Sequence, residues 1–287
     1  MQPAIASGPV CRDDARRMIS VLRKYRKVFD IGLQNTFVYR WNFLIRSLFG
    51  LVPLAGTVFI WRAIFKGTGE TVGTYDYSAM IWYFLLIILV DNLVTPTEDE
   101  WQIAADIREG QISAFLTKPL NYLGYRISLF LSYRIVYTLV TVLPLTLAFL
   151  WFRDLIVLPK SLATWPLFFL STAMAAAISF LIAYTLALLA FWILEISTIV
   201  FILYSFEYFL SGQTFPIDIM PAWIQGILRW LPFPYELFFP VQIFLERVHG
   251  AALWTGLAIQ AGWVLTLFTL AQTVWRRGIR HYQAVGG

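Results

Sequence analysis

Long apolar runs separated by short polar segments make up most of this chain. A helix needs about 20 mostly apolar residues to cross a bilayer. Runs of roughly this length occur at Trp41–Phe65, Tyr77–Val94, Gly124–Trp151 and Ala251–Trp275. A longer run, Trp165–Leu210, has 46 residues and is expected to hold two helices with a tight connection. The pattern therefore predicts an all-α membrane protein with six transmembrane helices.

The charged residues within the longest run indicate where its turn lies. Glu195 is the only charge near the middle of Trp165–Leu210, so the connection is expected at Leu194–Ser197. Composition agrees with a membrane protein, because 59% of the residues are apolar, only 14% are charged and the mean hydropathy is +0.68. A soluble domain is nearer half apolar and a quarter charged.

Residues 13–35 follow a different pattern, with apolar and basic side chains on opposite faces of one predicted helix. The apolar positions at helical spacing are Met18, Val21, Leu22, Tyr25, Val28 and Phe29. The basic positions are Arg16, Arg17, Arg23, Lys24 and Lys27. This arrangement is typical of an amphipathic helix at the membrane interface, where basic side chains face anionic lipid. A helix packed on a partner protein is the alternative.

A polar stretch, Pro96–Asn121, separates the second and third apolar runs. It is too polar to lie in lipid and too long for a tight turn. Its pattern predicts a short helix that ends at Glu109-Gly110, then a second short amphipathic piece and a stop at Lys118-Pro119. A structured amphipathic element between two spans indicates a contact with something outside the membrane.

The segment Ser211–Gly250 is apolar but repeatedly broken by proline. Prolines stand at positions 216, 221, 232, 234 and 240, and the pieces between them are too short to cross a bilayer. One short helix is expected from Pro221, at its first turn, and a second at Tyr235–Val248. Broken backbone at membrane depth must be buried in protein or line a cavity. We therefore expect two outer-leaflet half-helices before the sixth span.

The distribution of Lys and Arg predicts the topology. The region up to Arg40 carries eight basic residues and the tail after Trp275 carries three. Loops rich in positive charge stay in the cytoplasm, so both termini are expected there, which requires an even number of spans. The polar stretch Pro96–Asn121 is then cytoplasmic, whereas the loops Lys66–Tyr75 and 152–164 face outward.

No enzyme motif is found in the sequence. Lys66-Gly67-Thr68-Gly69 has the residues of a phosphate-binding loop in the wrong order, and no hydrolase, zinc-protease or dinucleotide signature is present. The single cysteine, Cys11, has no metal-site spacing. The net charge of +5 lies mainly at the ends and in one loop, which does not indicate nucleic acid binding. Any ATPase that serves this chain must be another polypeptide.

Four of the charged residues inside or near the predicted spans need a specific explanation, because charge is costly there. Arg46 is expected to extend its guanidinium to the cytoplasmic headgroups. Asp91 and Arg134 lie on consecutive spans, so an ion pair between them is one option. Glu207 is expected either to line a substrate path or to satisfy broken backbone near Ser211-Gly212.

The order and spacing of these features resemble the type-2 ABC exporter permeases, also described as the type V exporter fold. The local matches are Ile107–Ile112 with Leu116–Leu120, and Ser211-Gly212 through Phe215-Pro216 with Met220-Pro221. The resemblance covers essentially the whole chain. It implies a single permease domain over residues 1–287, with a cytoplasmic tail and amphipathic helix at 1–40, a six-span bundle at 41–275 and a second cytoplasmic tail at 276–287.

The resemblance also implies partners and contact residues. The polar stretch would be a coupling helix docked on cytoplasmic ATP-binding subunits, two per complex, which would hold ATP and Mg²⁺; no cofactor is expected in this chain. The implied ATPase contacts are Trp101, Ile103, Ile107, Arg108, Glu109, Gly110 and Gln111. A second permease chain, identical or different, would pair mainly through the first and fifth spans, in the bacterial inner membrane.

Two other functions stay open from the sequence alone. One is a secondary transporter or channel that needs no ATPase, although acids near the span ends give a proton relay little support. The other is a membrane scaffold for a motility or assembly complex. The apolar, aromatic-rich spans do not identify a cargo, and lipid-linked, drug-like and peptidic compounds are all compatible with them.

Overall fold

The computed structural model describes residues 10–68, 71–96 and 99–282. Helices account for the regular structure of these residues, and an isolated bridge between Val72 and Tyr75 is the one β-type pairing among them. The α-helices, in chain order, are α1 (Val10–Val38), α2 (Arg40–Thr68), α3 (Tyr77–Val94), α4 (Asp99–Arg108), α5 (Gln111–Leu116), α6 (Tyr122–Trp151), α7 (Thr164–Ala187), α8 (Ser197–Leu210), α9 (Ala222–Leu228), α10 (Phe238–Phe244) and α11 (Gly250–His281).

The predicted spans correspond closely to the long helices. Among the described residues, α2, α3, α7 and α11 are long and apolar enough to cross a membrane, and the bent helix α6 makes a fifth candidate. The bend of 44° in α6 lies just before Pro144, which has no N–H to continue the helical hydrogen bonding. In contrast, α2 continues through Pro53. The chain is thus a multi-pass helical protein.

The second helix of the longest apolar run is shorter than predicted. α7 continues as a 3-10 turn, Leu188–Phe191, and the chain then reverses at residues 192–196, close to the expected turn. The returning helix α8 has 14 residues, fewer than the ~20 needed for a full crossing. It ends because Gly212 adopts a left-handed φ of +90° and directs the chain away. The arrangement with six complete spans therefore remains a prediction, because α8 is too short to cross the membrane fully.

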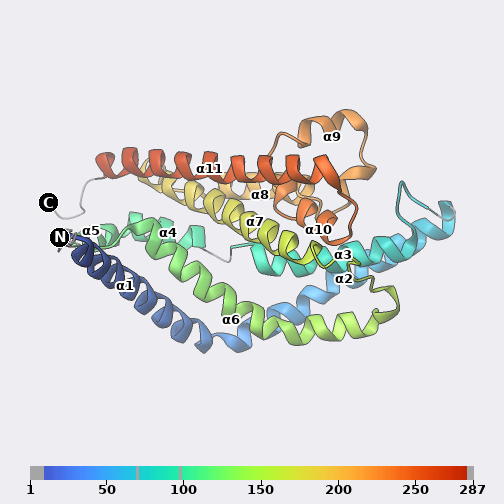
Figure 1. Ribbon diagram of the computed structural model, residues 1–287, viewed down its shortest axis with the longest axis horizontal. Coiled ribbons are helices and arrows are strands. Elements are labelled where there is room, and N and C mark those ends of the chain that lie inside the picture. The colour runs from blue at the N-terminus through green and yellow to red at the C-terminus, as the bar shows by residue number, and fades with distance from the viewer. Residues whose placement is uncertain (1–9, 69–70, 97–98, 283–287) are drawn as a thin grey trace, which may run out of the picture.

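The helices run between two ends of an elongated molecule (Figure 1). α4, α5, the start of α1 and the end of α11 lie at one end, which we call the α4 end. The connections from α2 to α3 and from α6 to α7 lie at the opposite end, which we call the far end. Both described chain ends are thus at the same end as the polar stretch, which agrees with an even number of passes.

Two helices form the centre of the bundle. Most of the central parts of α3 and α7 are buried, and Met80, Ile81, Leu85 and Ile178 are fully enclosed. By comparison, α2 has most of its surface uncovered. The start of α3 is fixed by the Asp76 carboxylate, which accepts a hydrogen bond from the backbone of the helix's first turn at 2.7 Å. A well-packed centre and an open α2 distinguish the two sides of the molecule.

The proline-divided segment forms short helices, as predicted. α9 and α10 flank a 3-10 turn, Phe233–Tyr235, and α10 packs against α3 and α7. The second helix is shorter than the expected Tyr235–Val248, because it ends at Phe244 and Glu246 has a positive φ of 53°. The buried Gln260 amide donates to the carbonyls of Ser171 and Tyr235, at 2.9 Å each, and ties the segment to the bundle.

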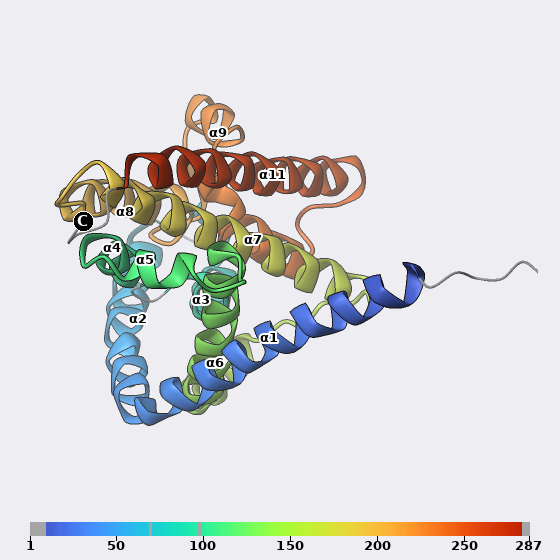
Figure 2. The ribbon, with the colours of Figure 1, turned by 90° about the vertical axis from the view of Figure 1, so that its left-hand side faces the viewer.

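The helix α1 packs along α6 and extends beyond the rest of the molecule at its start (Figure 2). Gly32 permits close approach, since a Cβ there would collide with Ser132 of α6. The Tyr25 hydroxyl also accepts a hydrogen bond from the Asn121 backbone, at 3.1 Å. The predicted helix 13–35 is confirmed as part of Val10–Val38. The side chains of 10–21 lie outside the description, and its position at a membrane interface stays a prediction.

Candidate functional site

Helix α4 lies across the α4 end of the bundle and is held there by its inner face. Ile103, Ala104 and Ile107 are buried against α7 and the 3-10 turn that follows it. Its first turn carries Asp99 and Glu100, and negative charge is favourable at a helix N-terminus. Apolar packing on one face therefore fixes the position of a short helix that would be unstable alone.

The outer face of the same region is exposed. The side chains of Trp101, Arg108, Glu109 and Gln111 are exposed, whereas those of Ile103 and Ile107 are covered by the bundle. Ile103 and Ile107 are two of the seven residues implied as ATPase contacts. In this conformation they pack against the bundle and hold α4 in position. We use the name docking face, after the contact expected from the sequence, for a set of exposed side chains on α4, α5 and the connection between them: Trp101, Arg108, Glu109, Gln111 and Leu116.

The predicted break at Glu109-Gly110 is present and depends on glycine. Gly110 has a φ of +77°, a left-handed conformation that is easily accessible only without a side chain. The Glu109 N–H donates to the Ala105 carbonyl at 2.9 Å, which completes the last turn of α4. The Gln111 amide then donates to the Glu109 carboxylate, also at 2.9 Å. The break redirects the chain into α5, and the hydrogen bond keeps the Glu109 and Gln111 side chains together across it.

An ion pair that sequence reasoning missed connects α4 to the start of α6. The guanidinium of Arg126, which is 3% exposed, contacts the Asp106 carboxylate. The Tyr122 hydroxyl donates to Asp106 at 2.7 Å and accepts from Arg126 at 3.0 Å. The available signal was a cation near the start of an apolar run, where a buried charge requires a partner.

Aromatic stacking connects α5 and α6 to α11. The Tyr122 ring stacks on Trp275 of α11, with centroids 5.0 Å apart and planes 9° apart. Phe115 of α5 meets the same tyrosine ring edge-on, at 4.9 Å. The hydroxyls of Ser113 and Tyr282 also hydrogen-bond, at 2.9 Å. The docking face is therefore attached to the last helix as well as to α6.

The turn between α7 and α8 receives a further contact from α4. The Arg108 guanidinium donates to the Leu194 carbonyl at 3.2 Å. Beside it, the Ser197 backbone N–H donates to Glu195 and lowers the pKa of that exposed carboxyl below its ordinary value. On the inner side, the Tyr204 hydroxyl of α8 hydrogen-bonds Glu100. Helix α4 thus contacts α6, α7 and α8 at once.

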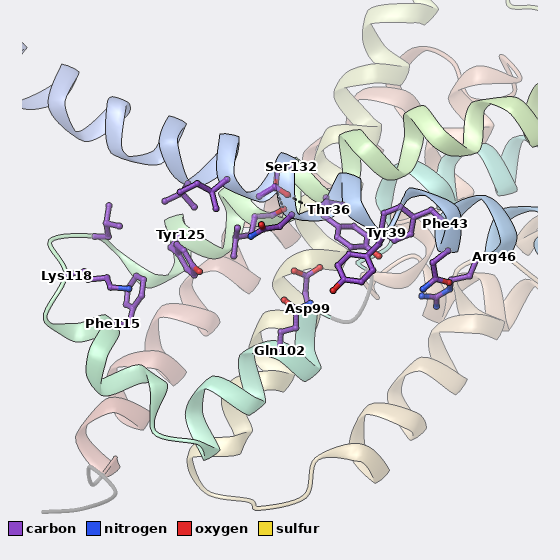
Figure 3. A pocket seen from close by; sticks show the side chains of 18 residues that line it. Thr36, Tyr39, Phe43, Arg46, Asp99, Gln102, Phe115, Lys118, Tyr125 and Ser132 are labelled. Atoms are coloured by element: carbon purple, nitrogen blue, oxygen red, sulfur yellow. Dashed lines mark hydrogen bonds between the residues drawn. The ribbon is translucent and has the colours of Figure 1, made fainter.

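A cavity of about 710 Å³ lies beside α4, between α1, α2 and α6 (Figure 3). We call it the α1–α2 cavity. Two cations line it, Arg46 and Lys118, together with the buried acid Asp99. In Figure 3 the two cations lie at opposite ends of the cavity, with Asp99 between them. The remaining polar lining residues are Asn35, Thr36, Tyr39, Asn42, Gln102, Tyr125, Ser132 and Tyr133.

Two further cavities follow α2 toward the far end. The second, about 310 Å³, shares Arg46 with the α1–α2 cavity and extends to Phe84 on α3. The third, about 350 Å³, shares Leu51 and Leu54 with the second. The lining of the third is apolar throughout and consists of Leu51, Leu54, Ala55, Val58, Phe59, Leu147, Ala148, Trp151 and Phe152. The three cavities therefore adjoin one another along α2.

The charges predicted within the spans have partners other than the expected ones. The Asp91 carboxylate accepts from Thr95 at 2.5 Å, and Arg134 donates to the Asn92 carbonyl at 2.8 Å. The suggested Asp91–Arg134 ion pair is therefore not the arrangement that the described residues adopt. Nε and Nη2 of Arg134 have no hydrogen-bond partner there. Arg46 is exposed and lines two of the cavities.

Glu207 forms a carboxyl–carboxyl hydrogen bond with Glu236, a residue that sequence reasoning missed. Glu236 is 1% exposed and also contacts the Ser179 hydroxyl of α7. A hydrogen bond between two carboxyl groups requires a proton on one of them. The signal for Glu236 was an isolated acid in an apolar, proline-divided segment. Glu207 therefore joins α8 to the half-helix segment. This is close to the second role suggested from the sequence, in which Glu207 stabilises the broken region after α8.

The far end is held by a separate polar network. The Tyr75 hydroxyl donates to Asp218 at 3.0 Å and accepts from the Gln242 amide at 2.8 Å. The Arg247 guanidinium lies 3.7 Å from the centre of the Tyr75 ring. Burial raises the pKa of both Tyr75 and Asp218 above their ordinary values. This network ties the α2–α3 connection to the half-helices.

Comparison with known families identifies the chain. The family model of the ABC-2 family transporter proteins matches residues 51–286, from within α2 to beyond the end of α11. A comparison with curated proteins found no match. Within the described residues, no group of three or more His, Cys, Asp or Glu side chains is placed to hold a metal ion. The family match, the apolar helices and the two-ended bundle agree, and the chain belongs to the ABC-2 family of membrane transport permeases.

Proposed function

We propose that this chain is the membrane subunit of an ATP-driven exporter and that its docking face binds separate cytoplasmic ATP-binding subunits, two per complex. One observation carries the proposal: α4 is fixed to the bundle by its inner face, while Trp101, Arg108 and Glu109 stay exposed on the other. A helix held in this way can transmit a displacement. ATP and Mg²⁺ would be held by the partner.

The contacts of α4 suggest how a displacement would spread. A push on the docking face would move α6 through the Asp106–Arg126 ion pair and the α7–α8 turn through Arg108. Movement of α5 would reach α11 through the Tyr122–Trp275 stack. The buried contacts around Arg126 suit this role because packed interiors transmit strain rather than absorb it, whereas the Arg108 contact lies at the surface. The amphipathic helix α1 would follow, since it packs along α6.

A second permease chain, identical or different, is part of the proposal. The large apolar side chains of α2 and α8 remain exposed in the single chain, among them Phe49, Val52, Phe59, Phe201 and Phe206. Pairing through these helices would enclose a path between the two chains. We also propose that the complex lies in the bacterial inner membrane, with the α4 end and both termini in the cytoplasm, as the distribution of basic residues indicates.

Charge reversal on the docking face tests the proposal. The double variant Arg108→Glu, Glu109→Lys should insert normally but lose co-purification with the ATP-binding subunit and lose transport in the intact complex. The matched control is Arg153→Glu, Asp154→Lys, which reverses an exposed pair at the far end. Retained association and transport in the docking-face variant, at the level of the control, would refute the proposed interface.

A further inference from the structure

We propose that the three adjoining cavities along α2 form one binding site for a lipid with an anionic headgroup. The headgroup lies in the α1–α2 cavity at the α4 end, and the acyl chains follow α2 toward the far end. Binding to this site is independent of ATP. The further step, that such an amphiphile is the cargo, rests on the proposed export function.

The first support is continuity. Arg46 lines both the first and the second cavity, and Leu51 and Leu54 line both the second and the third. On α2 the lining runs from Asn42 to Phe59. At 1.5 Å per residue this distance is about 26 Å, close to the ~30 Å hydrocarbon thickness of a bilayer. The acyl chains of one lipid occupy only one leaflet, about half of that thickness. The site is therefore long enough for a headgroup together with an acyl chain, and longer than a small soluble ligand needs.

The second support is a gradient of polarity along the site. The α1–α2 cavity is lined by Arg46, Lys118 and several amide and hydroxyl side chains, including Asn35 and Tyr39. The second cavity has a mixed lining of polar and apolar residues, which includes Asp91. The third cavity has only apolar lining residues, such as Leu147 and the others named above. An amphiphile with a polar head and apolar tails has the same gradient. A uniformly polar or uniformly apolar ligand would leave one end of the site unmatched.

The third support is charge. The part of α1 whose side chains are described, together with the start of α2 (residues 22–46), contains six basic residues and one acid. Four of the basic residues, Arg23, Lys24, Arg26 and Lys27, precede the lining residue Val28 on α1. Two acids line the site: Asp99 in the α1–α2 cavity, which is 6% exposed, and Asp91 in the second cavity, whose carboxylate accepts a hydrogen bond from Thr95. Basic side chains at the headgroup level favour anionic lipid.

The volume of the α1–α2 cavity indicates a headgroup larger than a bare phosphate. At about 710 Å³ it has room for a hydroxylated headgroup between its two cations. Tyrosine hydroxyls and asparagine amides can donate to and accept from such hydroxyls. Lys118 comes from the segment after α5, so an occupied site would also touch the part of the chain that carries the docking face.

Photolabelling of the full-length chain in nanodiscs tests the proposal without ATP or the ATP-binding subunit. The probe is phosphatidylglycerol with a diazirine on one acyl chain, in a phosphatidylcholine background. Phosphatidylcholine with the same diazirine chain is the second arm, and soluble glycerol phosphate is a competitor. We expect phosphatidylglycerol to label the peptide that contains Leu51–Phe59 several-fold more than phosphatidylcholine does, and glycerol phosphate to leave the labelling unchanged.

Variants locate the headgroup and the chains separately. Arg46→Gln with Lys118→Gln should reduce the labelling to the phosphatidylcholine level. Arg62→Gln, an exposed cation on α2 outside the cavities, should not. Ala55→Trp should fill the third cavity and abolish labelling there, whereas Gly56→Trp, which has open space around its Cβ, should retain it. Lys118→Gln alone changes an exposed side chain and should fold normally. It therefore serves as the control for misfolding of the double variant.

Three results would overturn the proposal. Equal labelling by the two lipids in the unmodified chain would remove the headgroup preference. Displacement of the probe by glycerol phosphate would mean that a soluble phosphate compound occupies the cavity. Undiminished labelling in the Arg46, Lys118 double variant would place the lipid elsewhere. Because no ATPase is present, each of these results can occur while the proposed docking face remains correct.

Discussion

Asp106 on α4 and Arg126 on α6 form an ion pair that joins the helix of the docking face to a long helix of the bundle. The arginine is almost fully buried, while the acid is about one-fifth exposed, with side-chain exposures of 4% and 22%. The Tyr122 hydroxyl hydrogen-bonds to both groups. The ring of the same tyrosine stacks on Trp275 of α11. Arg126 thus lies where α4, α6 and α11 meet. Its ion pair is therefore a place to test how firmly the bundle holds α4.

Asp106→Asn should destabilise the chain, because it leaves the buried Arg126 charge without its counter-charge. Removing one partner of a buried ion pair costs about 3 kcal/mol or more. We expect a clearly lower melting temperature of the purified protein, and lower transport per complex where ATP-binding subunits remain attached. The control is Asp154→Asn, in an exposed pair that should contribute less than about 1 kcal/mol. Equal melting temperatures for the two variants would show that the Asp106 pair does not hold α4.

Gly212→Ala should be more harmful than its small size suggests. Gly212 has a φ of +90°, and a Cβ there would lie 2.7 Å from the Tyr83 hydroxyl oxygen and 2.9 Å from Cβ of Phe238. The strained backbone alone costs on the order of 1–3 kcal/mol. Gly226→Ala is the matched control, because a Cβ there meets nothing within 4 Å. We expect a lower thermal stability and poor expression for the first variant only; the reverse order would contradict the described end of α8.

Glu207→Gln should be tolerated or stabilising at neutral pH. Two adjacent carboxylates cannot both be ionised without strong repulsion, and the hydrogen bond between Glu207 and Glu236 needs a proton from solvent. A glutamine amide supplies the donor without that proton. Glu236→Ala should instead lower the melting temperature, because it removes a fully buried side chain and its contact with Ser179. A marked loss of stability in Glu207→Gln would indicate that the negative charge itself is needed.

Sequence reasoning located elements whose limits are set locally. α3 has the bounds predicted from its apolar run, since Asp76 caps one end, and the break at Gly110 follows from a glycine after a helical run. Interactions between distant residues were not accessible in the same way. The Asp106–Arg126 pair depends on how α4 is tilted against α6, and the length of α8 depends on the turn at Gly212. Periodicity gives the face of a helix, but not the partner that covers it.

The cavities show the same limit. Arg46 was recognised as a charge that must reach the headgroup level, but the approach of Lys118 from the segment after α5 requires the fold. Similarly, the sequence indicates which side of α4 is apolar, yet Trp101 is exposed and Ile107 buried only because α7 covers one of them. Site residues contributed by separate elements are therefore the part that the sequence alone leaves open.

Glu246 should make the stability of the far end dependent on pH. The Ser161 backbone N–H and the Thr164 hydroxyl each donate to its carboxylate at 2.8 Å, and the backbone hydrogen bond is the main reason that the pKa of Glu246 lies below its ordinary value of 4.5. A group whose pKa is lower in the folded state stabilises the fold above its unfolded pKa. That contribution is lost as the pH falls from 4.5 through the folded pKa.

Glu246→Gln keeps the acceptor oxygen but cannot be protonated, so its melting temperature should fall less than that of the unmodified chain when the pH is lowered from neutrality to below 4.5. The measurement is thermal unfolding of the purified protein over that range. Asp154→Asn, an exposed acid at the same end with only its neighbour Arg153 as an ion-pair partner among the described contacts, should keep the original pH dependence. If Glu246→Gln keeps it too, the hydrogen bonds to Ser161 and Thr164 do not stabilise the ionised carboxylate.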